Sequence, residues 1–296
     1  MTGSRSTPAP KAPGVFITFD GGEGSGKSTQ IDRLTRRLAA LGYDTIATRE
    51  PGGSPKAEQL REIILSGFVE PYGPAAEALA FAAARIDHLD HTIRPALKDG
   101  CIVICDRFMD STRAYQGASG KVDPALIAAL EHVSVGDTRP DLTLILDLPP
   151  EEGLERARIR RGTSTTDRFE NENLEFHRAV RKAFLDIAAN EPDRCIRIYA
   201  GKSADDVEMD IREAVQAKLY ERLGIADTEA DGSNRSGKDG SARIHEGEPA
   251  RMPRAPRLRV VSDSDSPRTG IELAGNTKGH PPTPSQNSGD KGKDSA

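Results

Sequence analysis

A glycine-rich stretch near the N-terminus carries residue types that bind phosphate. From Gly21 to Ser28 the chain reads G-G-E-G-S-G-K-S, which matches the pattern G-x-x-x-x-G-K-[ST]. In this pattern backbone N–H groups surround phosphates, a lysine bridges the β- and γ-phosphates, and a hydroxyl binds Mg²⁺. We therefore predict that Lys27 is catalytic and Ser28 is a metal ligand, against the alternative of a glycine-rich turn before an ordinary helix. The predicted nucleotide-phosphate site consists of Gly21, Gly22, Glu23, Gly24, Ser25, Gly26, Lys27, Ser28 and Thr29.

A carboxylate and a guanidinium group stand side by side at Asp106-Arg107, directly after an apolar run. A guanidinium group can bind phosphate through two hydrogen bonds, and a carboxylate can hold a metal or orient the arginine. We predict that Arg107 is catalytic and that Asp106 is a metal ligand. The alternative is a structural ion pair.

Arginines gather again at 156–161, before a Gly/Ser/Thr segment that ends in D-R-F-E at 167–170. A flexible segment of this composition can close over phosphates, exclude water and bring positive charge to the transferred group. We predict catalytic roles for Arg158, Arg160 and Arg161, and the sequence leaves open which of them reaches the phosphates. A solvated helix face is the alternative for each one.

Strands and helices alternate around these motifs. Short apolar runs at 15–19, 45–48, 101–105, 142–148 and 195–199 have the composition of buried parallel strands. Apolar residues spaced by three and four predict the helices between them, and an alanine-rich stretch at 74–98 predicts a long helix bent near Pro95. The pattern predicts an α/β three-layer fold of the P-loop NTP hydrolase type, with a five-stranded parallel sheet, helices on both faces and ligands at the carboxyl ends of the strands.

Composition sets the domain limits and the class of protein. We predict a disordered arm at 1–13, one domain at 14–225, and a disordered polar tail at 226–296, where large apolar residues nearly vanish. The net charge of −5 argues against nucleic acid or an anionic membrane as a partner. The sparse cysteines form no C-x-x-C pair, and no apolar run approaches the length of about 18 residues needed to span a membrane. These observations predict a cytoplasmic protein.

The ordered set of motifs resembles bacterial thymidylate kinases (dTMP kinases) from Val15 to about Leu223. Besides the glycine-rich loop, the resemblance rests on T-R-E-P-G-G at 48–53, F-A-A-A-R at 81–85, D-R-F at 106–108, S-T-R-A-Y-Q-G at 111–117 and R-P-D-L-T at 139–143. The loop has Gly24 and Ser25 where one subtype carries a basic residue, so the chain is similar to the subtype with lid arginines. It departs from the family in a longer lid between Gly162 and Asp167, and in the tail.

The resemblance implies a reaction: phosphorylation of dTMP to dTDP with MgATP, on the way to dTTP for DNA synthesis, by a homodimer. It implies that Phe81 stacks on thymine and that Arg85 bonds the base edge. It also implies that Arg49 approaches the acceptor phosphate and that Glu23 lies near the 3′-hydroxyl. The implied dTMP site consists of Glu23, Arg49, Pro51, Phe81, Arg85, Arg107, Thr112 and Gln116. From the residues alone, a core aromatic in an alanine-rich helix is the favoured interpretation of Phe81.

A phosphate monoester has a second pKa of about 6, so its oxygen is already ionised at neutral pH and needs no general base. We therefore assign no role to histidine, and we predict that His88 and His91 are solvated helix positions. The absence of N-K-x-D from the sequence argues against a GTPase. The remaining alternatives are another nucleotide or deoxynucleoside kinase, and a nucleotide-binding switch that holds ATP without turnover.

Overall fold

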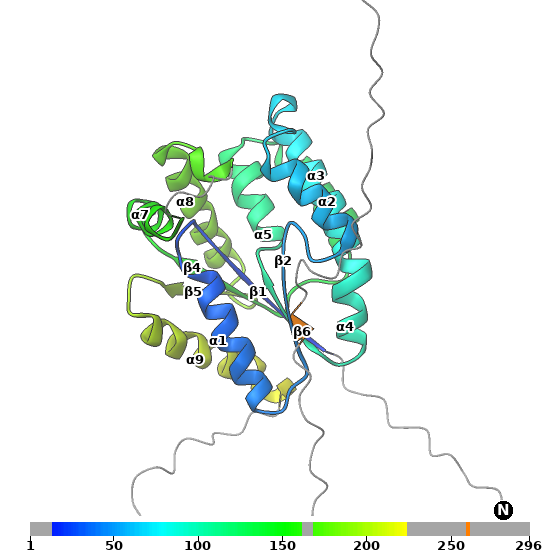
Figure 1. The fold of residues 1–296 in the computed structure, drawn as a ribbon, viewed down its shortest axis with the longest axis vertical. Coiled ribbons are helices and arrows are strands. Elements are labelled where there is room, and N and C mark those ends of the chain that lie inside the picture. The colour runs from blue at the N-terminus through cyan, green and yellow to red at the C-terminus, as the bar shows by residue number, and fades with distance from the viewer. Residues whose placement is uncertain (1–13, 162–167, 224–258, 261–296) are drawn as a thin grey trace, which may run out of the picture. The chain divides into compact units, whose positions relative to one another are not determined.

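Short apolar segments form the strands of a central parallel sheet (Figure 1). The computed structural model describes residues 14–161, 168–223 and 259–260, with the backbone alone at 161, 220–223 and 259–260. In that part of the chain the strand order is β5-β4-β1-β3-β2-β6, and all neighbouring strands are parallel. The strands are β1 (Val15–Gly21), β2 (Thr45–Arg49), β3 (Ile102–Asp106), β4 (Leu142–Asp147), β5 (Cys195–Tyr199) and β6 (Arg259–Val260).

The predicted sheet is confirmed, with one addition. All the predicted strands are present, and every residue of β1 and β4 is buried, which explains their unbroken apolar character. The addition is β6, which pairs with the outer edge of β2 so that Ile46 lies opposite Arg259. The α/β three-layer prediction therefore holds.

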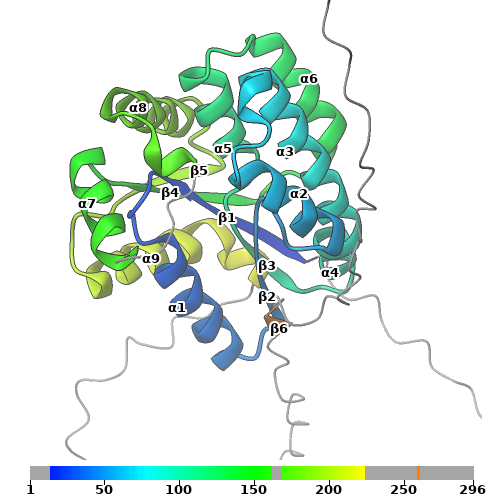
Figure 2. The same ribbon diagram turned by 45° about the horizontal axis from the view of Figure 1, so that its top comes forward.

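Helices cover both faces of this sheet (Figure 2). Helices α1 and α9 pack on one face, where they meet Ile17 and Phe19 of β1, while η2, α4 and α5 pack against Phe16 on the other. The α-helices are α1 (Lys27–Ala40), α2 (Pro55–Leu65), α3 (Pro74–His88), α4 (Arg94–Lys98), α5 (Met109–Thr112), α6 (Pro124–Val135), α7 (Pro150–Arg161), α8 (Leu174–Asn190) and α9 (Ala204–Leu223). The shorter segments are the 3₁₀ turns η1 (Glu70–Tyr72) and η4 (Phe169–Asn171) and the π turns η2 (Leu89–Ile93) and η3 (Arg113–Ser119).

The long helix predicted at 74–98 consists of α3, η2 and α4. Pro95 has no N–H to donate, and its ring would collide with the carbonyl four residues earlier in a regular α-helix. The backbone adopts a π turn just before this proline, and the helix then continues through α4. The sequence predicts a bend near Pro95, and the structure has the π turn η2 directly before α4, the segment that contains Pro95.

The described residues all belong to one compact unit. The arm predicted at 1–13 lies outside the described residues, and so does the tail predicted at 226–296 apart from β6. None of the described helices is long and apolar enough to cross a membrane.

Candidate active site

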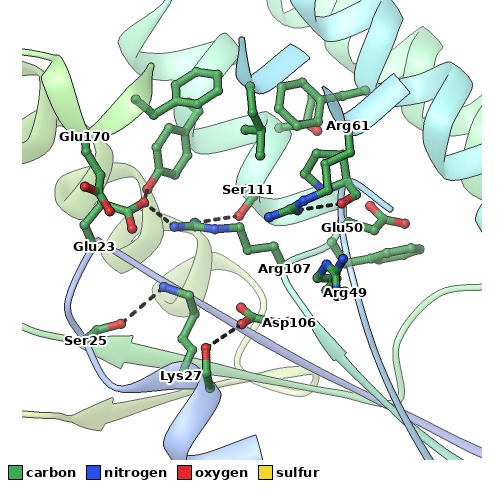
Figure 3. Close-up of a pocket in the computed structure, with 18 of the residues that line it drawn as sticks. Glu23, Ser25, Lys27, Arg49, Glu50, Arg61, Asp106, Arg107, Ser111 and Glu170 are labelled. Carbon is green, nitrogen blue, oxygen red and sulfur yellow. Dashed lines mark hydrogen bonds and ion pairs between the residues drawn. The ribbon is translucent and has the colours of Figure 1, made fainter. Parts of the chain in front are cut away.

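The carboxyl ends of β1, β2 and β3 meet at one edge of the sheet. Asp106 at the end of β3 is in register with Phe19 of β1 on one side and with Arg49 of β2 on the other. Parallel sheets bind ligands at this edge. A cavity of about 220 Å³ lies there, and Figure 3 shows most of the residues that line it.

The glycine-rich loop joins β1 to α1, and Lys27 is the first residue of the helix. Lys27 Nζ donates to the carbonyl oxygens of Gly21 at 3.1 Å and Gly22 at 2.9 Å, so the ammonium group lies inside the loop. Burial, and then the nearby Arg107, lower the pKa of Lys27 to about 8. The loop therefore holds a buried lysine that is still mostly protonated at neutral pH.

Two positions in the loop require glycine. Gly26 has φ of 90° at the N-cap of α1, and Gly24 has φ of 66°; both angles lie in the left-handed region that favours glycine. A Cβ on Gly24 would lie 1.9 Å from the carbonyl oxygen of Gly153 in α7. The backbone of the loop thus packs directly against α7, the helix that carries the predicted lid arginines.

Ser28 and Asp106 lie together, as the metal-site prediction requires. Ser28 Oγ donates to Asp106 Oδ2 at 3.1 Å. Asp106 Oδ1 is buried and has no hydrogen-bond partner among the described residues. A hydroxyl beside a carboxylate oxygen that lacks a partner fits Mg²⁺, which takes few protein ligands and keeps water and phosphate oxygens. The described residues contain no cluster of three His, Cys, Asp or Glu side chains suited to a metal.

Arg107 lies at the centre of the cavity, between Glu23 and Ser111 (Figure 3). Its guanidinium group donates to the carbonyl oxygen of Gly21 at 3.2 Å and to Ser111 Oγ at 3.3 Å, and it pairs with Glu23. Its Cζ lies 5.0 Å from the centre of the Tyr115 ring. Its φ of 66° is unusual for a residue with a side chain, and such strain is common at functional sites.

The charges of Glu23 and Arg107 depend on the groups around this ion pair. Burial alone would raise the pKa of Glu23, but Arg107 and Lys27 outweigh it and lower that pKa to about 2. Burial would likewise lower the pKa of Arg107, yet the neighbouring Tyr115 and Glu23 raise it. Tyr115 also donates its hydroxyl to Glu23 at 3.1 Å. Both groups of the pair are therefore ionised at every pH of interest.

The predicted acceptor residues line the same cavity. Arg49, Pro51, Phe81, Arg85, Thr112 and Gln116 are all present there. Arg49 pairs with Glu58 at 3.1 Å, and Arg61 donates to the carbonyl oxygen of Pro51 at 2.7 Å (Figure 3). The structure thus brings the whole predicted dTMP set together with the glycine-rich loop.

Phe81 and Arg85 both belong to α3 and both line the cavity. Arg85 donates from Nε to Glu50 Oε2 at 2.8 Å and from Nη2 to Thr112 Oγ1 at 3.1 Å. The Phe81 ring lies 6.0 Å from the Phe169 ring, centre to centre. This part of the cavity combines an aromatic surface with a fixed guanidinium group.

The predicted lid arginines differ from one another. Arg160 is exposed and lines the cavity. Arg158 is exposed and makes two hydrogen bonds to Glu155 on its own helix, at 2.8 and 2.7 Å, and it does not line the cavity. The side chain of Arg161 lies outside the described part of the chain. Thr29, predicted at the phosphate site, is exposed on α1 and does not line the cavity.

Sequence reasoning missed several residues at this site. Ser111 and Tyr115 lie inside the quoted S-T-R-A-Y-Q-G motif and could have been found from it, whereas Arg61 stands in no quoted motif. The missed residues that line the cavity are Glu50, Arg61, Leu65, Phe108, Ser111, Tyr115, Phe169 and Glu170. The prediction that His88 is solvated is wrong, because it is fully buried (0% exposed).

Comparisons with known proteins agree with this geometry. The family model for thymidylate kinase matches residues 19–211. A thymidylate kinase of Bradyrhizobium diazoefficiens is 56% identical over 206 residues, covering 70% of this chain and 90% of that protein. One of Afipia carboxidovorans is 54% identical over 219 residues, covering 74% of this chain and 96% of that protein. The crystal structure of thymidylate kinase from Ehrlichia chaffeensis is 34% identical with a TM-score of 0.55, and the match covers 69% of this chain and 100% of that one. With matches that extend over nearly the whole length of these relatives, the chain belongs to the thymidylate kinase family and is an ATP-dependent nucleoside monophosphate kinase.

Proposed function

We propose that the chain phosphorylates dTMP to dTDP with MgATP as donor, on the way to dTTP for DNA synthesis. The observation that carries the proposal is the single cavity that runs from Lys27 in the glycine-rich loop to Phe81 and Arg85. Donor and acceptor sites in one cavity allow direct in-line transfer, in which positioning and charge neutralisation do most of the catalysis.

At the donor end, the residues from Gly21 to Thr29 hold the ATP phosphates, with Lys27 on the β- and γ-phosphates. Lys27 already lies inside the loop, bonded to two carbonyl oxygens that it can leave for stronger anionic partners. Ser28 and Asp106 would hold Mg²⁺, which when bound neutralises charge on the β- and γ-phosphate oxygens. Asp106 Oδ1, buried and without a partner among the described residues, supports that assignment.

At the point of transfer, Arg107 and Arg49 bind the acceptor phosphate, and a lid arginine meets the charge on the moving group. Arg107 is suited to this because its raised pKa keeps it charged and its contacts with Gly21 and Ser111 fix its position. Of the predicted lid residues Arg158, Arg160 and Arg161, Arg160 is the best supported, since it lines the cavity as the chain stands. No proton transfer from a histidine is needed, because the acceptor oxygen is already ionised.

At the acceptor end, thymine stacks on Phe81 and bonds Arg85, with Thr112, Gln116 and Pro51 around it. Stacking of a base on an aromatic ring stabilises binding by about 1–3 kcal/mol. Glu23 accepts a hydrogen bond from the deoxyribose 3′-hydroxyl, a role that suits a carboxylate kept ionised by Arg107.

The proposal extends to assembly and location. Apolar side chains are exposed on α2, α3 and α6: Ile63 (42%), Leu79 (54%) and Val133 (72%). In Figure 2, α3 lies between α2 and α6 and contacts both. An exposed apolar surface of this kind favours burial against a second copy of the chain. We therefore propose a homodimer. Three free cysteines and the absence of a spanning helix from the described residues support a cytoplasmic location.

The test is a direct assay of the purified chain with MgATP and each common nucleoside and deoxynucleoside monophosphate, with diphosphate formation measured by chromatography. We expect the highest rate with dTMP, and no transfer by the Lys27→Met variant at an unchanged melting temperature. Preference for another monophosphate would refute the base pocket. ATP binding without transfer to any acceptor would favour the nucleotide-binding switch.

A further inference from the structure

A fully buried histidine lies behind the cavity and connects three elements. His88, near the end of α3, has 0% exposure. Its Nδ1 lies 3.2 Å from Glu50 Oε1, and its Nε2 lies 2.7 Å from Thr48 Oγ1. Glu50 and Thr48 belong to the turn and the strand that come before α2, far from His88 in the sequence. The mechanism proposed above gives this ring no part.

The chemistry of the partners fixes how the ring must bond. An ionised carboxylate can only accept a hydrogen bond, so Nδ1 must carry a proton and donate it to Glu50. In a neutral ring Nε2 then accepts from the Thr48 hydroxyl. His88 thereby holds one oxygen of the Glu50 carboxylate, and the other oxygen accepts from Arg85 Nε at 2.8 Å.

Glu50 therefore connects the histidine to Arg85 through one buried carboxylate. The Arg85 side chain is 3% exposed, and the Glu50 side chain is 4% exposed. Nε and Nη2 of Arg85 are used by Glu50 and Thr112, which leaves Nη1 without a hydrogen-bond partner among the described residues. Because Arg85 also lines the cavity, Nη1 is the nitrogen that it can offer to a ligand.

The turn at 50–53 is built closely around the histidine ring. A Cβ on Gly53 would lie 2.3 Å from His88 Nε2 and 2.4 Å from Thr48 Oγ1, and Gly53 has φ of 82°. Only glycine leaves room for the ring at this distance. The second glycine of the R-E-P-G-G motif is therefore explained by His88, and the ring has little freedom to move.

From these contacts we infer that His88 is a positioning residue for base recognition: it orients Glu50, and Glu50 holds the Arg85 guanidinium group so that Nη1 meets the base edge. The inference rests on the proposed function, since it concerns how the same pocket selects its base. Thymine presents a carbonyl oxygen at its 4-position, whereas cytosine presents an amino group that donates. An Arg85 held in one orientation can donate a hydrogen bond to the thymine oxygen, whereas its N–H group would face another donor in cytosine.

The experiment measures kcat/KM for dTMP and for dCMP, and KM for ATP, in wild type and in His88 variants. His88→Leu removes both ring contacts, and we expect the ratio of kcat/KM for dTMP to that for dCMP to fall by at least about tenfold. We expect KM for ATP to stay within about twofold of wild type. His91→Leu is the matched control, because that histidine is on the next turn of the same helix and 58% exposed. It should leave the ratio unchanged.

Two amide variants, His88→Asn and His88→Gln, provide a second test if His88→Leu does not fold. Asparagine can place its NH₂ group where Nδ1 stands and can donate to Glu50, whereas glutamine places it nearer to Nε2. We expect His88→Asn to keep most of the selectivity and His88→Gln to lose it. Equal selectivity in the two folded variants would overturn the inference.

A double-mutant cycle separates positioning from a general structural role. If His88 acts through Arg85, removing the histidine in an Arg85→Met background should change the selectivity ratio no further. The same fall in both backgrounds would contradict the inference, and so would an equal loss for dTMP and dCMP. Failure of the wild-type chain to phosphorylate dTMP would refute the proposed function instead, so the two failures are distinct.

Discussion

At the scale of single residues, the buried lysine of the glycine-rich loop makes activity depend on pH. The pKa of Lys27 is lowered to about 8, so the lysine is charged below that pH and becomes neutral as the pH rises through it. A neutral amine cannot balance phosphate charge. We therefore expect kcat/KM for ATP, which reports the free enzyme, to fall above about pH 8.

A Lys27→Arg variant provides the comparison. Arginine stays protonated throughout this range, so whatever activity the variant keeps should not show the alkaline fall. An identical fall in both proteins would assign the titration to another group and contradict the assignment to Lys27.

Phe81 tests the base pocket at the same scale. Phe81→Ala removes the stacking surface, which is worth about 1–3 kcal/mol per base, so we expect KM for dTMP to rise by about 5- to 150-fold. KM for ATP should change little, because the donor phosphates bind at the opposite end of the cavity. Steady-state kinetics with each substrate varied in turn gives both constants. An equal rise in the two would mean that Phe81 is a structural aromatic, packed on Phe169.

At the scale of elements, the glycine-rich loop and α7 touch backbone to backbone. A Cβ on Gly153 would lie 2.3 Å from the carbonyl oxygen of Glu23, so a side chain there must push the helix away from the loop. We expect Gly153→Ala to lower kcat by about tenfold or more, since a displacement of about 1 Å can cost about a hundredfold in rate. Gly117→Ala is the control, because its Cβ would lie in ordinary van der Waals contact, 3.5 Å from Ile127 and 3.8 Å from the carbonyl oxygen of Thr112. Equal kcat in the two variants would show that this contact does not position the lid helix.

How far the sequence predicts these elements depends on how local their signals are. The positions of β1 and β3 follow from the apolar runs at 15–19 and 101–105, because burial on both faces of a sheet leaves a continuous apolar pattern. The glycine-rich loop is predictable for the same reason, since its geometry depends on residues next to one another.

Long-range contacts leave no such pattern. His88 is a polar residue that the sequence analysis places in solvent, and its burial depends on contacts with Thr48 and Glu50, which are 40 and 38 residues away. The pairing of β6 with β2 likewise depends on a meeting of distant segments. Whether Arg160 lines the cavity depends on where α7 ends, and the number of residues between Gly162 and Asp167 does not determine that position.

At the scale of the whole molecule, the apolar residues exposed on α2, α3 and α6 predict a dimer that a single charge can weaken. Leu79→Glu places a carboxylate on α3, where we expect it to shift the mass measured by sedimentation towards the monomer. Met209→Glu is the matched control, because both side chains are 54% exposed and α9 packs on the other face of the sheet. If Met209→Glu dissociates the dimer and Leu79→Glu does not, the interface lies on the α9 face and the proposed interface is wrong.

The chain extends beyond the part that matches its relatives. The match to the Bradyrhizobium diazoefficiens protein takes 90% of that protein but 70% of this chain, and the family match ends at residue 211. Nearly the whole of the relative is therefore matched, and the family match covers none of the residues after 211. We expect a chain that ends at Ala226 to keep kcat within about twofold of the full chain.

The same truncation removes β6 from the edge of β2, so a small fall in melting temperature should accompany the unchanged kcat. A full-length Val260→Pro variant isolates that effect, because proline cannot donate to the strand ladder while the rest of the extension stays. We expect it to match the truncated chain in melting temperature. If truncation lowers kcat tenfold while Val260→Pro leaves it intact, the extension acts on catalysis by a route other than β6, and the prediction of a passive tail fails.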